Sequence, residues 1–359
     1  MSTEGIRDRA PGFHEATVTF RSIVEEQPGD RLKDLFDVAW PAYRRWFLRD
    51  GELARPSYAR CLRALRTYVP ELVPVYEKLV GTVGGGDLEA RFLSLWEPTP
   101  FFSACSIAAV PGADRGIVRN YDYVPALCET TLLASQLAGR RTLAMSDCLW
   151  GVLDGVNEDG LAVALAFGGR RVVGRGFAIT LLLRYLLEMC ATVEQAIEAA
   201  RIVPVNLAYN VVVADAEGDA AFLQIAPDHE PVLSRDVLFA GNRQGKTEWA
   251  EHAVMTETVA REEAIAAALV SGPGREELER AFLSEPIYRP HLRHTWGTVY
   301  TASYSCRDRT VRLLWPDESW ELSLAAPYEE ERTRRMVMTM PPVLERTFEP
   351  PHTPDVIFA

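Results

Sequence analysis

The sequence predicts an α+β protein in which antiparallel sheets are layered with helices. Its 359 residues are 48% hydrophobic and 25% charged, the balance of an ordinary globular protein, so a large core can form without disulfides or metals. Patterns typical of strands and of helices occur in separate blocks, whereas a parallel doubly wound sheet would alternate them. Short turns join neighbouring strand patterns, which is typical of hairpins. The length exceeds that of a typical single domain, so we expect one large domain with an extra lobe, or two domains.

Residues 1–104 are expected to form a helical N-terminal segment. Apolar residues recur at helical spacing in three stretches, 32–39, 58–68 and 71–79. Pro41 is expected to start a new turn or to kink the first helix, because proline lacks the N–H that a helix interior needs. The glycine run 84–86 lacks the strand, lysine and helix of a phosphate-binding loop, so we interpret it as a flexible joint.

Strand patterns begin near residue 101. An apolar run at 105–110, a turn at 111–114 and a second run at 116–123 indicate a hairpin. Further strands are expected at 131–137, 149–156, 161–167, 207–214, 220–225 and 237–240, with a late hairpin joining 296–303 to 310–315. Helices are expected at 177–189, 192–201 and 256–283. We therefore expect an α+β domain over residues 105–340, followed by a Pro-rich tail of irregular structure over residues 341–359.

The net charge of −12 argues against nucleic acid or an anionic membrane as the main partner, since both attract a basic surface. Arg170, Arg171 and Arg175 form a basic cluster that is either a small basic pocket or a solvated turn. The N-terminus lacks the apolar stretch of a signal peptide, and no apolar run is long enough to span a membrane. Six cysteines without a CxxC pair indicate reduced thiols. We expect a cytoplasmic protein; the sequence carries no signal for its oligomeric state.

Cysteine chemistry is the reaction that the sequence favours. A nucleophilic thiol needs a base that removes its proton and donors that stabilise the developing oxyanion. Papain-like enzymes use a histidine as the base, but none of the six histidines of this chain stands in a familiar Cys/His context. The alternative base is the α-amino group of the cysteine itself, whose ordinary pKa is about 7.7–8.0. That arrangement requires the cysteine to become the first residue of a chain by cleavage before it.

Cys105 fits this role better than the other cysteines. It begins a strand run and follows the small residues Ser103 and Ala104, which let the carbonyl before it approach the thiol closely. The partner strand of the hairpin carries Arg119 and Asp122, which are costly to bury unless they are paired or used. Arg119 can stabilise a thiolate and Asp122 can hold the new α-ammonium, although a regular strand points them to opposite faces unless it bulges or ends. The alternative is an inert buried thiol beside a structural ion pair.

Three motifs carry a resemblance to known families. The stretch CSIAAVPGADRGIVRNYDY, residues 105–123, resembles a segment of the choloylglycine hydrolase, penicillin V acylase and acyl-coenzyme A:6-aminopenicillanate acyltransferase families. In those families a nucleophilic cysteine starts one strand and an Arg-Asn-x-Asp-aromatic motif follows on the next. The stretch DGVNEDGLAVALAFGG, residues 154–169, resembles a hairpin of the same families, and FAGN, residues 239–242, resembles the strand end that carries their oxyanion-hole asparagine. The resemblance covers roughly residues 100–320.

The resemblance implies an N-terminal-nucleophile hydrolase with a four-layer αββα sandwich. It implies self-cleavage between Ala104 and Cys105, with Cys105 as the nucleophile of the processed chain. Arg119 and Asp122 carry over as its immediate partners, and Asn242 as the donor to the oxyanion. No metal or cofactor is implied.

Four features qualify the resemblance. An arginine that often follows the oxyanion asparagine has its nearest match in Arg261, which is otherwise a solvated helix charge beside two glutamates. Ala166 stands where choloylglycine hydrolases tend to have an asparagine, and Ala104 replaces a glycine before the cysteine. The long N-terminal segment is unlike bile-salt hydrolases and favours the aminopenicillanate acyltransferase branch, in which this segment stays bound after self-cleavage.

We therefore expect an autoproteolytically activated cysteine amidohydrolase or acyltransferase that acts on the linear amide bond of a small acylated substrate. The first alternative is an acyltransferase that uses an acyl-coenzyme A-type thioester as donor. The second is a non-catalytic binding protein that keeps the fold without processing, which the substitution at Ala166 favours.

Two further motifs stay open in the sequence. His291 and His294 have the spacing of half a metal site, without a convincing third ligand. Trp296, Tyr300 and Tyr304 recur on one face of a predicted strand, where they either pack in the core or line a hydrophobic acyl pocket.

Overall fold

The computed structural model describes residues 13–290, 292–293 and 297–339 of the chain. The Pro-rich tail expected after residue 340 lies outside the described residues, as do His291, His294 and Trp296. Among the described helices, none combines the length and the apolar character that crossing a membrane requires.

The strands of the described residues form two sheets. The larger contains β1 (Phe13–Val24), β4 (Thr131–Ser135), β5 (Thr142–Asp147), β6 (Gly151–Asn157), β7 (Ala162–Phe167), β8 (Tyr209–Ala214), β9 (Ala220–Ala226), β10 (His229–Ser234), β12 (Leu292–Arg293) and β16 (Glu330–Thr339). The smaller contains β2 (Ala104–Val110), β3 (Gly116–Tyr123), β11 (Phe239–Ala240), β13 (Gly297–Ser305), β14 (Thr310–Trp315) and β15 (Glu318–Ser323). Their spatial orders are β10-β9-β8-β7-β6-β5-β4-β1-β16-β12 and β11-β2-β3-β13-β14-β15. All described neighbours are antiparallel except β1 with β4 and β12 with β16.

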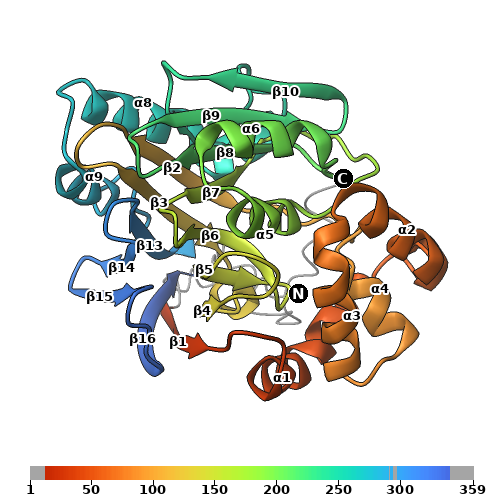
Figure 1. Cartoon of the computed structure of the whole chain (residues 1–359). Coiled ribbons are helices and arrows are strands. Elements are labelled where there is room, and N and C mark those ends of the chain that lie inside the picture. Colours follow the sequence, from red (N-terminus) through yellow and green to blue (C-terminus); the bar gives the residue numbers. More distant parts are fainter. Residues whose placement is uncertain (1–12, 291, 294–296, 340–359) are drawn as a thin grey trace, which may run out of the picture.

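The helices cover the outer faces of the sheets and one side of the molecule. They are α1 (Asp30–Phe47), α2 (Tyr58–Tyr68), α3 (Val73–Thr82), α4 (Asp87–Leu93), α5 (Ile179–Met189), α6 (Val193–Ile202), α7 (Ala250–Met255), α8 (Thr258–Leu269) and α9 (Arg275–Phe282). Helices α5 and α6 pack on the larger sheet, whereas α8 and α9 pack on the smaller one (Figure 1). The inner faces of the sheets meet where β2 and β3 contact β7. The predicted αββα sandwich is confirmed.

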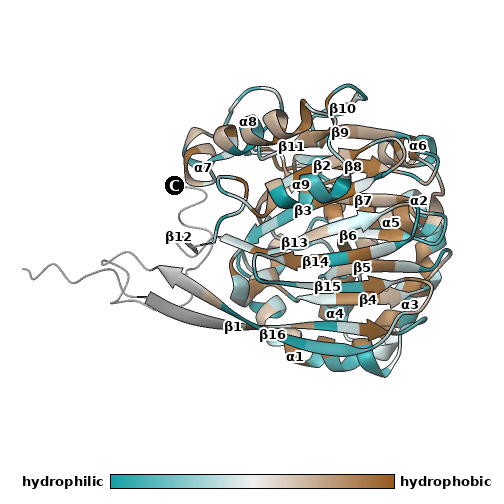
Figure 2. Cartoon of the chain, turned by 90° about the vertical axis from the view of Figure 1, so that its left-hand side faces the viewer, coloured by the Kyte–Doolittle hydropathy of each residue, from teal (hydrophilic) through white to brown (hydrophobic). Residues whose placement is uncertain are grey.

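The N-terminal segment is not wholly helical, which corrects the expectation for residues 1–104. Strand β1 forms because its apolar residues alternate rather than follow a helical period: Val18 and Phe20 are buried, whereas Thr17 is exposed. It pairs antiparallel with β16 and parallel with β4, so it lies in the interior of the larger sheet. Figure 2 shows β1 and β16 running side by side. The N-terminal segment is therefore built into the sandwich.

The helical part of this segment differs from expectation in one detail. Helix α1 continues through Pro41, so Pro41 does not begin a separate helix. Pro41 is exposed, so water can satisfy the carbonyl that loses its helical partner.

The sequence also predicted one charged helical region at 256–283, where the structure forms α8 and α9 on either side of the glycine and proline residues at 272–274.

Replacing Phe20 by alanine should lower the free energy of unfolding by about 3–5 kcal/mol, because a fully buried ring would leave a cavity between the sheets. The Phe20 ring packs edge-on against Tyr300 and Trp315, with centroids 6.1 and 5.0 Å away. Denaturant titration measures the difference. Leu53→Ala is the control, since Leu53 is fully exposed and its replacement should change the free energy by less than about 0.5 kcal/mol. Equal stability of Phe20→Ala and wild type would show that β1 does not belong to the core.

Candidate active site

Cys105 lies at the start of β2, between two neighbouring strands. It faces Tyr121 in the pairing of β2 with β3, and β11 pairs on the other side of β2, at Ile107 and Ala108. The side chain is fully buried, and the hydroxyl of Ser103 lies 3.5 Å from its sulfur. In the intact chain, the segment before Cys105 therefore adjoins the sulfur directly.

Arg119 is the cation that contacts this sulfur. Its Nη2 donates to Cys105 Sγ at 3.3 Å, and its Nε donates to the Leu165 carbonyl at 2.9 Å. Burial acts to lower the pKa of the guanidinium, but the charges of Cys105, Tyr300 and Asp154 outweigh burial and hold the pKa well above its ordinary value. Arg119 therefore stays charged beside the sulfur. This contact is the one that the sequence predicted for it.

Asp154 on β6 fixes the position of Arg119, and sequence reasoning did not single it out. It forms a fully buried ion pair with Arg119 Nη1. The hydroxyls of Tyr300 and Tyr304 donate to its two carboxylate oxygens at 2.7 and 2.5 Å. These two tyrosines therefore bond a buried carboxylate instead of lining an acyl pocket. A charge within the apolar strand LWGVLDGVN was the sequence signal for Asp154.

Asp122 lies on the opposite face of β3 from Arg119. The two residues are three apart on a regular strand, and the register shift in this region, between Thr298 and Tyr300 of β13, does not bring them together. The Asp122 carboxylate accepts hydrogen bonds from Thr298 Oγ1 at 2.7 Å and from Arg261 Nη1 at 3.3 Å. Burial raises its pKa, against the charge of Arg261. In the intact chain Asp122 thus acts on the cysteine through Arg261 rather than as its immediate partner.

Arg261, the least certain sequence candidate, lies in the site. It is fully buried, which excludes a solvated helix charge. Its Nη1 donates to the carbonyl oxygen of Cys105 at 2.8 Å, and its Nη2 donates to Asn242 Oδ1 at 2.7 Å. Burial lowers its pKa, and the charge of Asp122 opposes that effect. Arg261 therefore holds the backbone of Cys105 rather than its thiol.

Asn242 contacts the backbone of Cys105 and of Ser103, the residues on either side of Ala104. Its Oδ1 accepts from the Cys105 backbone N–H at 3.1 Å, and its Nδ2 donates to the carbonyls of Phe167 at 3.0 Å and Ser103 at 3.5 Å. Gly169 allows the approach of this loop: it has a φ of +67°, and a Cβ there would stand 2.0 Å from the Asn242 carbonyl oxygen. The amide thus lies beside residues 103–105, with its Nδ2 donating to the Phe167 and Ser103 carbonyls.

The strand beside Ala166 carries an asparagine that contacts the loop of Asn242. Ala166 pairs with Asn210 of β8. The Asn210 Nδ2 donates to the carbonyls of Gly241 at 3.0 Å and Arg243 at 2.9 Å, on either side of Asn242. Asn210 therefore positions the candidate oxyanion donor, a role that no local sequence signal revealed.

The remaining basic candidates do not form a pocket. Arg170 is paired with Asp228 at 2.7 Å and with Glu248 at 2.9 Å, and Arg175 is paired with a glutamate at 3.0 Å. The Arg171 guanidinium lies over the ring of Trp249, 4.5 Å from its centroid. No group of side chains among the described residues could hold a metal ion.

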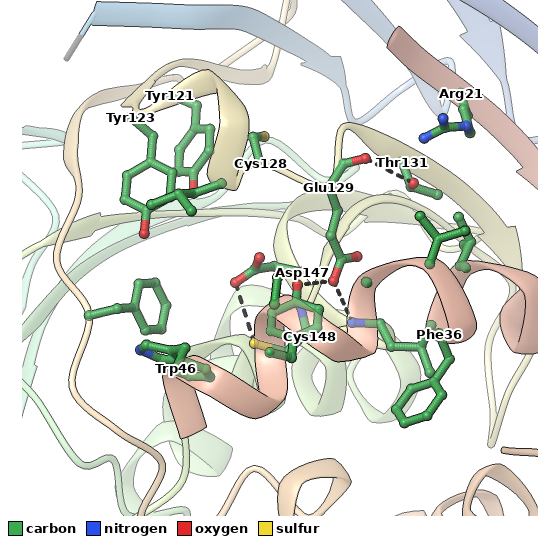
Figure 3. Close-up of a pocket in the computed structure, with 18 of the residues that line it drawn as sticks. Arg21, Phe36, Trp46, Tyr121, Tyr123, Cys128, Glu129, Thr131, Asp147 and Cys148 are labelled. Atoms are coloured by element: carbon green, nitrogen blue, oxygen red, sulfur yellow. Dashed lines mark hydrogen bonds between the residues drawn. The ribbon is translucent and has the colours of Figure 1, made fainter. Parts of the chain in front are cut away.

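A pocket of about 360 Å³ lies between α1 and the ends of β3 and β5 (Figure 3). Phe36 and Trp46 of α1 form one wall, and Tyr121 and Tyr123 of β3 form another. Phe102 also lines it, three residues before the candidate nucleophile. Because Tyr121 is the strand partner of Cys105, the pocket ends close to the sulfur.

Two carboxylates, the half-buried Glu129 and the buried Asp147, form the polar side of this pocket (Figure 3). Glu129 accepts hydrogen bonds from the Tyr43 hydroxyl and from the Leu149 N–H, the latter at 2.8 Å. The thiol of Cys148 donates to Asp147 at 3.7 Å. Burial, and then the charge of Glu129, raise the pKa of Asp147 to about 8. Burial also raises the pKa of Glu129, so the pair retains a proton at neutral pH.

Comparison with known proteins gives one family match. The family model described as acyl-coenzyme A:6-aminopenicillanic acid acyl-transferase matches residues 111–320, more than half of the chain. The matched region contains Arg119, Asp122, Asn242 and Arg261, and begins six residues after Cys105. A search of curated proteins found no match.

Several solved structures are similar at low sequence identity. Penicillin V acylase from Agrobacterium tumefaciens is 14% identical with a TM-score of 0.36, and 64% of this chain and 82% of that chain are covered. The N-acylethanolamine-hydrolyzing acid amidase ortholog of Caenorhabditis elegans is 14% identical with a TM-score of 0.39, with 61% and 99% covered. A mutant of conjugated bile acid hydrolase from Clostridium perfringens is 11% identical with a TM-score of 0.39, with 66% and 99% covered.

Replacing Asp147 by asparagine should flatten the pH dependence of stability. The pKa of an aspartate is about 3.9 in an unfolded chain, whereas that of Asp147 is raised to about 8 by burial. As pH rises from about 4 to about 8, the folded protein holds a proton that the unfolded chain has released, so the free energy of unfolding falls.

Denaturation midpoints of the two proteins across this range measure the effect. Asp159→Asn, at an exposed ion pair with Arg140, is the control and should keep the wild-type slope. An unchanged slope in Asp147→Asn would contradict the assigned protonation.

Proposed function

Because the chain belongs to the acyl-coenzyme A:6-aminopenicillanic acid acyl-transferase family, we propose that it is an autoproteolytically activated cysteine amidohydrolase. One observation carries the proposal: a permanently charged guanidinium, that of Arg119, lies 3.3 Å from the Cys105 sulfur. Asn242 and Arg261 hold the backbone N–H and carbonyl of the same cysteine. Thiol, cation and amide thus converge on one residue, and no histidine of the described ranges is bonded to its sulfur.

Self-cleavage is the first proposed reaction. The Cys105 thiol attacks the carbonyl carbon of Ala104, the Ala104–Cys105 C–N bond breaks, and the proton passes to the departing nitrogen. The product is a thioester on Cys105 with a free α-amine. Water then hydrolyses the thioester, which leaves a carboxylate on Ala104 and restores the thiol. The full burial of Cys105 in the intact chain supports this order, because the chain's own peptide bond adjoins the sulfur that a substrate must later reach.

Turnover then uses the liberated α-amine as the base. It takes the thiol proton while the sulfur attacks a linear amide of a small acylated substrate. The Arg119 charge favours the thiolate during this step. Departure of Ser103 frees the Nδ2 of Asn242, which can then donate to the tetrahedral oxyanion. One such donor contributes about 3 kcal/mol to the stabilisation of the transition state.

A related proposal is acyl transfer, since the family is described by that reaction. In this case the acyl group on Cys105 passes from a thioester donor to an amine instead of to water. Assays with and without an added amine acceptor separate the two outcomes, because transfer yields a new amide and hydrolysis yields a free acid.

Purified wild-type protein should separate under denaturing conditions into fragments 1–104 and 105–359. Mass spectrometry and N-terminal sequencing measure this, and the larger fragment should begin with Cys105. Cys105→Ala should stay intact because it has no nucleophile. Cys61→Ala is the matched control, a buried cysteine in α2, and should be cleaved like wild type. An intact wild-type chain with full amidase activity would refute self-processing.

The N-terminal fragment should stay bound after cleavage. Its strand β1 pairs with β16 over ten residues and with β4 over four, so its release would break hydrogen bonds on both edges. Size-exclusion chromatography under native conditions should give one peak that contains both fragments. Separate elution without denaturant would show that β1 does not anchor the fragment.

A further inference from the structure

An aromatic box encloses the residue that lies three positions before the nucleophile. The Phe102 ring packs against Phe167 of β7, with centroids 4.7 Å apart, and against Trp249, at 5.5 Å. His252 of α7 completes the box: it stacks on Trp249 at 4.9 Å and meets the edge of Phe167 at 5.2 Å. Each of these four side chains is buried.

His252 and Trp249 both carry buried polar atoms without a hydrogen-bond partner of normal geometry, and His252 carries two of them. His252 is 3% exposed, and within the described part of the chain neither ring nitrogen forms a hydrogen bond of normal geometry; its nearest hydrogen-bonding neighbour is the Ser103 backbone. Burial, with the charge of Arg261, lowers its pKa to about 3, while the nearby backbone of Ser103 acts in the opposite direction. The ring is therefore a neutral imidazole, and its weak contact with the Ser103 backbone leaves hydrogen-bonding capacity unused. Buried polar groups seldom stay without a partner unless a site uses them.

The position of the box relative to the scissile bond gives it a role. In the proposed self-cleavage, Ala104 supplies the carbonyl that the sulfur attacks, so residues 102–104 are the acyl group of the first acyl-enzyme. A later substrate must present its own acyl group to the same sulfur from the same side. The space that Phe102 fills in the intact chain is then the space for the acyl group of the substrate.

We propose that Phe167, Trp249 and His252 form the acyl-group specificity site of the processed enzyme. The inference rests on the proposed function and names its substrate class. The site takes an acyl group that carries an aromatic ring at the distance of Phe102 from the scissile carbonyl. Between ring and carbonyl the acyl group has an amide, which His252 binds as Ser103 departs.

The pocket of Figure 3 gives such an acyl group a route to the site. Phe102 lines that pocket, although its ring also contacts the box. Movement of Phe102 after cleavage therefore joins the pocket to the box. The aromatic walls on both sides suit an aromatic acyl group, since rings pack edge-on against one another.

The chain itself supplies the test substrate. Acetyl-phenylalanyl-seryl-alanyl-aminomethylcoumarin copies residues 102–104 in front of a fluorogenic amide, and acetyl-alanyl-seryl-alanyl-aminomethylcoumarin lacks the ring. The processed enzyme should cleave the first with a kcat/KM about tenfold higher or more, the range expected when a buried aromatic contact is lost. Trp249→Ala should remove most of this preference. Val254→Ala, at an exposed position of α7, should leave it unchanged.

A second comparison isolates the hydrogen bond of His252. His252→Phe keeps a ring in the box but removes both nitrogens, and should lower the kcat/KM of the peptide. It should not change the kcat/KM of the ω-phenylnonanoyl amide of the same fluorophore. In that substrate the ring lies the same number of bonds from the scissile carbonyl, but no amide lies between the ring and this carbonyl. His252→Gln should restore part of the peptide activity. A purely structural histidine would lower both activities together, and that result would overturn its role.

The outcomes separate this inference from the proposed function. A processed enzyme that cleaves both peptides equally, or neither of them, overturns the acyl-site assignment while Cys105 remains the nucleophile. A chain that is never cleaved before Cys105, and whose Cys105 is not acylated by a reactive thioester, overturns the proposed function itself.

Discussion

The fully buried guanidinium of Arg119 is the constraint on which the interior of the sandwich depends. Arg119 projects between the two sheets, where an unpaired charge would be prohibitively costly. Asp154 from the opposing sheet neutralises it, and Tyr300 and Tyr304 orient that carboxylate. The Nη1 of Arg119 is bound to Asp154 and its Nε to the Leu165 carbonyl, and these two contacts orient its Nη2 toward the sulfur of Cys105. The ion pair of Arg119 and Asp154 thus joins the two sheets, and its guanidinium also places a positive charge beside the sulfur.

The two faces of β3 carry residues that contact different parts of Cys105. On one face, Arg119 contacts its side chain. The other acts on its backbone, where Asp122 and Arg261 fix the carbonyl and Asn242 fixes the N–H. Side chains can contact both the thiol and the backbone of Cys105 in this way, because Cys105 lies at the start of its strand. Because side chains alternate between the two faces of a strand, the residue that places a charge beside the thiol is separated from the residues that position the backbone.

Much of this could be read from local sequence. The hairpin around Cys105 follows from turn chemistry, and Arg119 and Asp122 follow from charges in an apolar strand. Asn242 and Arg261 were predicted only through the resemblance to known families. The alternation of apolar residues in β1 was a local signal that the sequence analysis missed, whereas its pairing with the distant strand β16 leaves no local signal. The charge of Asp154 within an apolar strand was a local signal, but its partner Arg119 and the neighbours of His252 are brought near only by the folded chain. The spacing of Arg119 and Asp122 already indicated opposite faces of their strand, and the structure shows them there.

The place of β1 also has a kinetic consequence. Ser22 pairs with Glu330, so the larger sheet closes only after ribosomal synthesis of nearly the whole chain, and closing so long a loop is slow. Scission before Cys105 would then turn an intramolecular pairing into an association between two molecules. Once unfolded, a nicked protein would have to find its partner by diffusion, at a rate that depends on dilution. Such an enzyme is assembled once, and its persistence is set by how rarely it opens rather than by how readily it refolds.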